Sequence, residues 1–176
     1  MKKILVVIDM QKDFVDGALG TPEAVAIVPD VVKEIKKKYD KVFVTRDTHQ
    51  SNYLETQEGR NLPVVHCVED TPGWQLDKKV ANALKKVEDP VILNKPTFGS
   101  DRLAPRIRAY CDPKEIESIT LIGLCTDICV VSNAMLLKVA FPETELRCIA
   151  KCCAGVTPES HEAALTTMKM CQVKII

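Results

Sequence analysis

Residues 118–131, with the sequence SITLIGLCTDICVV, predict a buried strand that runs through a turn into an apolar helix. Thr126 and Asp127 are both suitable side chains for capping the start of this helix. Cys129 falls in the first helical turn, where unpaired backbone N–H groups and the helix dipole favour a thiolate over a thiol. We therefore expect an acidic, nucleophilic cysteine at the carboxyl edge of an α/β sheet, where such folds bind their ligands.

Runs of apolar and β-branched residues alternate with helical patterns along the whole chain. Strands are predicted at residues 3–8, 41–45, 90–94, 119–122, 145–150 and 171–176. Helices are predicted at residues 21–39, 75–87, 103–110, 126–140 and 157–170. This alternation indicates the α/β fold class: a single domain over residues 1–176, built as a three-layer αβα sandwich with a six-stranded, mainly parallel, Rossmann-like sheet.

The composition argues against several classes of partner. Lys+Arg and Asp+Glu balance at 24 each and the pI is near 6.8, so no excess of charge points to nucleic acid or to an acidic membrane. No apolar run approaches the roughly 18 residues that span a bilayer, and no signal-peptide pattern follows Met1. We expect a cytoplasmic protein that acts on a small molecule. Its 8 cysteines should be mostly reduced, and Cys148 and Cys171, which alternate with apolar neighbours, are predicted to lie in the core.

Charged residues follow three of the predicted strands directly or within the next turn, and the Cys129 turn follows a fourth. Asp9, Asp47, Lys95 and the Cys129 turn should therefore converge on one edge of the sheet. Asp9 could accept the thiol proton and return it to a leaving group, and Lys95 could stabilise both anions. The backbone N–H groups of Cys125 and Cys129 are candidates for an oxyanion hole. On spacing alone, Asp9 could equally be a loop cap, Lys95 a surface lysine and Cys129 a core residue.

The segment at residues 50–73 is long for a connection in a compact domain, and long ordered loops are usually functional. With the residues just before it, this segment brings five potential metal ligands within about twenty residues. They are Asp47, His49, Glu55, Glu58 and His66.

Four segments, in this order, resemble the isochorismatase-like cysteine hydrolases and most closely the nicotinamidases, also called pyrazinamidases. They are Asp9-x-Gln11-x-Asp13-Phe14, Arg46-Asp47-Thr48-His49, Lys95 and Gly123-x-x-Thr126-Asp127-x-Cys129-Val130. The resemblance covers essentially the whole chain and implies the isochorismatase-like hydrolase fold with a triad of Asp9, Lys95 and Cys129. It also implies a cis peptide bond before the oxyanion-hole residue Cys125. Cys129 itself argues against isochorismatase, because those relatives lack the nucleophile.

The resemblance further implies a divalent metal, zinc by preference, with manganese or iron as alternatives that the same ligands suit. Its ligands would be Asp47, His49, Glu58 and His66. One version of this family site has a further histidine six residues after the first. This chain has Glu55 at that position, so Glu58 must supply the fourth ligand or the site is weaker. Side chains expected to contact an aromatic substrate are Gln11, Phe14, Tyr53, Trp74 and Phe98, although the aromatic ones could be simple core residues.

The sequence therefore predicts an amidohydrolase that converts nicotinamide to nicotinic acid and ammonia through a thioester on Cys129. One alternative is a metal-free cysteine hydrolase of another small amide or carbamoyl compound. Another is a non-enzymatic thiol or metal-binding module, which would not need an acid and a lysine from other strands. Because relatives often form dimers or tetramers, we also expect a homo-oligomer.

Overall fold

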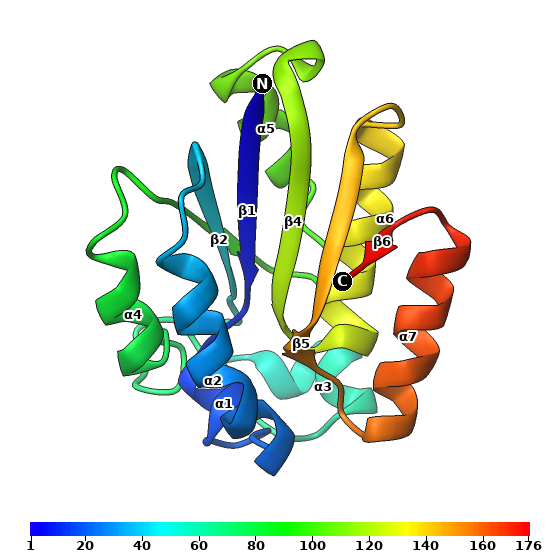
Figure 1. Cartoon of the computed structure of the whole chain (residues 1–176). Coiled ribbons are helices and arrows are strands. Elements are labelled where there is room, and N and C mark those ends of the chain that lie inside the picture. Colours follow the sequence, from blue (N-terminus) through cyan, green and yellow to red (C-terminus); the bar gives the residue numbers. More distant parts are fainter.

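The computed structural model describes all 176 residues and contains one six-stranded sheet with the strand order β3-β2-β1-β4-β5-β6 (Figure 1). Every neighbouring pair of strands is parallel, which confirms the predicted sheet. The strands are β1 (Lys2–Ile8), β2 (Lys41–Asp47), β3 (Val91–Lys95), β4 (Ile116–Leu124), β5 (Glu145–Ala154) and β6 (Lys174–Ile175).

The helices connect these strands and cover the sheet on both sides (Figure 1). The α-helices are α1 (Lys12–Val15), α2 (Pro22–Ile35), α3 (Gln57–Asn61), α4 (Lys78–Leu84), α5 (Leu103–Tyr110), α6 (Val131–Ala140) and α7 (Pro158–Met170). The helical segments of other types are η1 (Tyr53–Glu55), η2 (Pro113–Glu115) and η3 (Thr126–Val130). None of these helices combines the length and the apolar character needed to cross a bilayer.

The three layers follow from the alternation of side chains along the buried strands. Leu5 and Val7 of β1 pack in one core with residues of α2 and α4, and Ile4, Val6 and Ile8 pack in a second core with residues of α5, α6 and α7. All five side chains are fully buried, because helices cover both faces of the parallel sheet. The predicted αβα sandwich is confirmed.

The strand order reverses between β1 and β4, since β2 and β3 lie on one side of this pair and β5 and β6 on the other. Ile8 pairs with Gly123 at the carboxyl end of the two strands. Gly123 has a φ of 124°, and a Cβ atom there would lie 2.0 Å from the Ile8 carbonyl oxygen, so this close approach requires glycine. Reversal points of this kind are where open α/β sheets bind ligands.

Several boundaries differ from the sequence-based predictions. The last strand has two residues rather than six, because Cys171 forms the C-cap of α7 and Gln172 follows it with a positive φ of 66°. Cys171 is consequently exposed, so its prediction as a core residue is wrong, whereas Cys148 is buried as predicted. The α4 helix begins at Lys78 and not at residue 75, because the Asp77 carboxylate caps it by accepting from the backbone of Lys79 and Val80.

Candidate active site and metal centre

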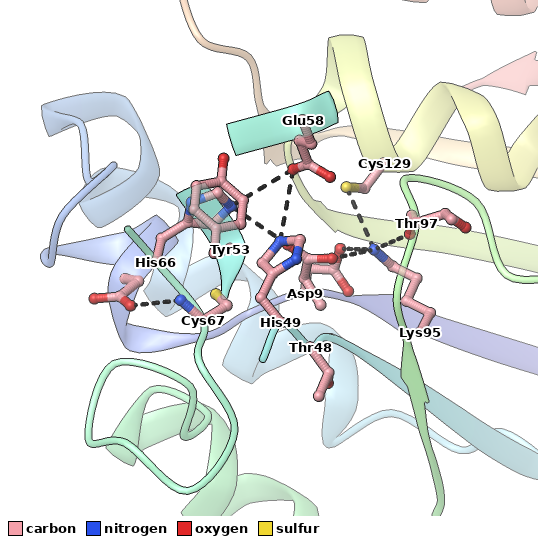
Figure 2. Close-up of polar contacts among 12 residues, drawn as sticks. Asp9, Thr48, His49, Tyr53, Glu58, His66, Cys67, Lys95, Thr97 and Cys129 are labelled. Atoms are coloured by element: carbon pink, nitrogen blue, oxygen red, sulfur yellow. Dashed lines mark hydrogen bonds and ion pairs between the residues drawn. The ribbon is translucent and has the colours of Figure 1, made fainter. Parts of the chain in front are cut away.

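Lys95 lies at the centre of the candidate active site (Figure 2). Its Nζ atom is 2.6 Å from Asp9 Oδ2 and 3.5 Å from Cys129 Sγ, and it donates a hydrogen bond to the Thr97 carbonyl at 3.0 Å. Asp9, Lys95 and Cys129 are 0%, 1% and 4% exposed. They come from the end of β1, the end of β3 and the turn after β4, so their predicted convergence on one sheet edge is confirmed.

The charges in this centre depend on one another. Burial raises the pKa of the Asp9 carboxyl, and the neighbouring Lys95 ammonium offsets this only in part. Burial alone would lower the pKa of Lys95, but Asp9 and the other acidic groups around it raise that pKa above its usual value. Asp9 also accepts a hydrogen bond from the Thr45 hydroxyl at 2.7 Å. The site therefore combines a permanent cation with a carboxylate that is able to take up a proton.

The turn that carries the nucleophile candidate is not capped as predicted. Residues Thr126–Val130 form a π-helix without a side-chain cap. The Thr126 hydroxyl lies 2.8 Å from His161 Nδ1, and the Asp127 carboxylate accepts a hydrogen bond from the backbone N–H of Val156. The capping prediction is wrong: both side chains instead tie the turn to the segment that follows β5.

The pKa of the Cys129 thiol is raised well above its usual value. Burial is the largest cause, the Asp9 carboxylate adds to it, and the Lys95 ammonium opposes it. The prediction of a thiol made acidic by the start of a helix is therefore wrong, because the buried sulfur lacks the solvation that a thiolate needs. A base must accept the thiol proton before Cys129 can attack, and Asp9 lies beside it.

The backbone before Cys129 is unusual in its peptide geometry and in its hydrogen bonds. The Leu124–Cys125 peptide bond is cis, as the family resemblance implied. The Cys125 N–H donates to no backbone carbonyl, while the Cys125 carbonyl accepts from Ile128 and Val130 within the π-helical turn. One N–H group at this turn is thus available to a ligand.

Four potential metal ligands gather next to this centre (Figure 2). One ligand atom from each of Asp47, His49, Glu58 and His66 lies within 4.8 Å of the others. His49 Nε2 is 2.9 Å from Asp47 Oδ2 and 3.6 Å from Glu58 Oε1. His66 Nε2 is 3.5 Å from the same Asp47 oxygen and 3.9 Å from the same Glu58 oxygen.

These four separations, 2.9–3.9 Å, bracket the spacing of ligand atoms around a small divalent ion. Bonds of about 2.0–2.1 Å in tetrahedral geometry place neighbouring ligand atoms roughly 3.3–3.5 Å apart, and two imidazoles with two carboxylates are ligands that zinc accepts. Glu55 does not belong to the cluster, so the geometry selects Glu58 between the two glutamates. The donor set therefore suggests a divalent metal.

Surrounding groups orient the two histidines. The backbone carbonyl of Val64 lies 2.8 Å from His66 Nδ1, which leaves Nε2 to face the cluster. The Tyr53 ring packs against both imidazoles, with centroid distances of 4.7 Å to His49 and 4.9 Å to His66. Burial alone would lower the pKa of His66, but hydrogen bonds to Asp47 and to the Val64 carbonyl raise it.

Asp47 belongs to both groups of residues. Its Oδ2 atom faces the histidines, and its Oδ1 atom is 3.4 Å from Lys95 Nζ. Burial would raise the pKa of this carboxyl, but the His49 and His66 hydrogen bonds and the Lys95 charge hold it far below its usual value. Asp47 is thus an anion that connects the ligand cluster to the lysine.

The residues predicted to contact an aromatic substrate are not all at the site. Phe14 and Tyr53 do lie at the site, since their ring centroids are 5.4 Å and 4.9 Å from that of His66. Trp74 is buried in the core, where its Nε1 donates to the Thr48 hydroxyl and Arg46 stacks on its ring.

Phe98 is 47% exposed and lines an outer cavity of about 580 Å³ with residues of α6. None of the candidate catalytic residues or metal ligands lines this cavity. The structure therefore does not bring the Phe98 ring to the ligand cluster.

Gln11 has a supporting position. Its Nε2 donates to the backbone carbonyls of Asp47 and Trp74, and its Oε1 accepts from the Asp47 N–H at 2.7 Å. Because these bonds occupy both ends of the amide, Gln11 fixes the end of β2 and has no polar atom left for direct substrate contact.

Other supporting residues were not identified from the sequence. Thr45 and Thr97 hold Asp9 and Lys95, and Asp13 accepts a hydrogen bond from the Cys67 N–H at 2.8 Å, next to His66. Asp13 could have been found, because it lies in the first family motif. The contact between Lys95 and the Thr97 carbonyl could not have been found, because every residue has a backbone carbonyl and the residue type does not reveal its use.

Comparison with known proteins identifies the family of this chain. The isochorismatase domain family matches residues 3–176, and the chain therefore belongs to that family. The nicotinamidase of Schizosaccharomyces pombe is 25% identical over 207 residues, covering 98% of this chain and 91% of its own length.

Two solved structures share the fold over nearly the full length of both chains. The pyrazinamidase of Pyrococcus horikoshii in complex with zinc has a TM-score of 0.80 and 29% identity, covering 100% of this chain and 99% of its own. A nicotinamidase/pyrazinamidase of Bacillus subtilis has a TM-score of 0.84 and 25% identity, with 99% of each chain covered. Together with the site geometry, these relatives identify a nicotinamidase-like hydrolase.

Proposed function

We propose that the protein hydrolyses nicotinamide to nicotinic acid and ammonia through a thioester on Cys129. The observation that carries this proposal is the position of Lys95. Its ammonium lies 2.6 Å from Asp9, 3.5 Å from the Cys129 sulfur and 3.4 Å from Asp47. One cation therefore links a proton acceptor, a nucleophile and a metal-ligand cluster, as an amide hydrolase that orients its substrate requires.

The first half of the reaction forms the thioester. Asp9 accepts the Cys129 thiol proton, the sulfur attacks the carboxamide carbon, and Lys95 stabilises the thiolate as it forms. The C–S bond places a negative charge on the former carbonyl oxygen. The N–H groups of Cys125 and Cys129 stabilise that charge. Asp9 then gives its proton to the amide nitrogen, the C–N bond breaks, and ammonia leaves.

The second half releases the acid. Asp9 is again a carboxylate and removes a proton from a water molecule, which attacks the thioester carbon. The same two N–H groups hold the second oxyanion. When the C–S bond breaks, the sulfur regains a proton from Asp9 and nicotinic acid leaves.

Asp47, His49, Glu58 and His66 would hold the divalent metal. When bound, the metal would hold the pyridine nitrogen and so orient the carboxamide towards Cys129. The aromatic ring would lie beside Phe14, whose own ring flanks His66. This arrangement favours a heteroaromatic amide with a ring nitrogen, which nicotinamide and pyrazinamide share.

The test measures ammonia release from nicotinamide, pyrazinamide and N-carbamoyl compounds. We expect turnover of the two heteroaromatic amides by the metal-loaded protein and none by Cys129→Ala. The matched control is Cys171→Ala, because Cys171 is exposed and remote from the proposed chemistry. Turnover retained in Cys129→Ala would refute the thioester. Ammonia release only from N-carbamoyl compounds would refute nicotinamide as the substrate and support the alternative substrate class.

A further inference from the structure

Residues 96–100, the first part of the loop between β3 and α5, are held by few hydrogen bonds. Those that leave the loop go to two side chains, Lys95 and Asn133. The Thr97 hydroxyl bonds within the loop, to the Gly99 carbonyl, and the buried Ser100 hydroxyl has no partner. The attachment of this loop to α6 therefore depends on Asn133.

Asn133 uses both ends of its amide. Its Oδ1 accepts from the Ser100 N–H at 3.0 Å, and its Nδ2 donates to the carbonyls of Phe98 at 3.3 Å and of Cys129 at 2.8 Å. The side chain is fully buried, so water does not compete for these bonds. One amide thus joins the segment that follows Lys95 to the backbone of the nucleophile residue.

The loop also rests directly on α6. A Cβ atom on Gly99 would lie 2.6 Å from Leu136 Cδ1 and 3.5 Å from Ser132 Cβ. The glycine allows close contact but provides no side chain to fix the position of the loop along the helix. The directional bonds of Asn133 provide that restraint.

We infer that Asn133 is a positioning residue that sets the separation between Lys95 and Cys129. Through the loop it fixes the Thr97 carbonyl, which accepts from Lys95 Nζ, and through the second bond it fixes the Cys129 backbone. A displacement of about 1 Å in such a pair costs roughly 100-fold in rate. Asn133 contacts neither the ligand cluster nor Phe14, so substrate binding should be nearly unaffected.

The experiment compares Asn133→Ala with Asn82→Ala in the full-length, zinc-loaded protein. Asn82 is an exposed residue of α4 and serves as the matched control. For nicotinamide we expect kcat to fall about 10- to 100-fold in Asn133→Ala while KM stays within about threefold. Alkylation of Cys129 by iodoacetamide, followed by peptide mapping, should also slow, because Lys95 then stabilises the thiolate less well.

Thermal unfolding and circular dichroism check that each variant is folded. If Asn133→Ala does not fold, Asn133→Asp replaces it, since this isosteric change keeps the acceptor for Ser100 and loses both donated bonds. Values of kcat and of the alkylation rate equal to those of Asn82→Ala would overturn the inference. So would a fall in kcat that only matches a loss of folded protein.

The measurement of kcat and KM rests on the proposed function, whereas the measurement of the Cys129 alkylation rate does not. A wild-type protein that releases no ammonia from nicotinamide would refute the proposed function. The alkylation rates would still decide whether Asn133 positions Lys95 and Cys129.

Discussion

The candidate triad and the metal-ligand cluster lie side by side but are built differently. Asp9 and Cys129 follow β1 and β4, Lys95 ends β3, and all three are at most 4% exposed. In the cluster only Asp47 ends a strand, whereas the other three ligands come from the connection between β2 and α4. The difference indicates that the rigid sheet sets the chemistry and a connecting segment sets what is bound.

Asp47 is the one residue that couples the two regions, through Lys95 on one side and the histidines on the other. The structure therefore predicts that most changes affect one region alone. Changes at Asp47 should affect both. The predictions that follow test this separation, starting with the largest effect.

Replacing Lys95 with methionine should have the largest effect. The change leaves the buried Asp9 and Asp47 without their shared cation, which costs about 3–5 kcal/mol of folding free energy for an uncompensated buried charge. The turnover of nicotinamide should fall by about 1,000-fold, because transition-state charge loses its nearest stabilising group. Urea unfolding and ammonia release measure the two losses.

Lys85→Met is the matched control for that change, because Lys85 is exposed on the surface next to α4. It should change neither quantity measurably. A Lys95→Met protein as active and as stable as this control would show that the cation is dispensable, and with it the whole triad.

Removal of the metal should separate the two regions. A chelator should lower nicotinamide turnover about 100-fold, because the substrate loses its orientation. The rate of Cys129 alkylation by iodoacetamide should fall far less than turnover, because the metal acts on the thiol only through the Asp47 charge. Adding zinc back should restore turnover, and an alkylation rate that falls with turnover would mean that the two regions are not separate.

Topology predicted that the three candidate residues would lie close together, whereas only the family resemblance assigned them to a triad. Parallel strands end at one edge, so Asp9, Lys95 and the Cys129 turn had to converge once the strands were recognised. The same rule cannot choose between Glu55 and Glu58. That choice depends on the start of α3, where the Thr56 hydroxyl accepts from the Gly59 N–H and so turns the chain.

The electrostatics of Cys129 also lay beyond the sequence. The pattern of residues 118–131 showed a helix start, which lowers a thiol pKa, but not that burial and Asp9 would raise it. Likewise Cys171 alternates with apolar residues and yet caps α7 at the surface. In both cases long-range packing, which a local pattern does not contain, decided the outcome.

A smaller effect should distinguish Asp47 from Glu58. Asp47→Asn and Glu58→Gln each remove one anionic ligand. Each should weaken zinc binding by at least the roughly 10- to 100-fold that loss of an outer-shell partner costs, measured by competition with a chromogenic chelator. Only Asp47→Asn should also speed Cys129 alkylation, because Asp47 raises the pKa of that thiol and the amide does not. Equal alkylation rates in the two variants would break the assignment of Asp47 to both regions.

The smallest effect concerns the pH dependence of stability in the chelated protein. His66 has a folded-state pKa raised above its usual value, so its contribution is complete below the unfolded-state pKa and is lost as pH rises through the folded one. Between about pH 6 and 9 the unfolding midpoint of the metal-free protein should fall by a few degrees, and His66→Gln should flatten this slope. With zinc bound the slope should reverse, because the metal needs the neutral imidazole. An unfolding midpoint that rises with pH in the chelated wild type would show that Asp47 does not stabilise a protonated His66. The four ligands would then interact only weakly with one another in the absence of metal.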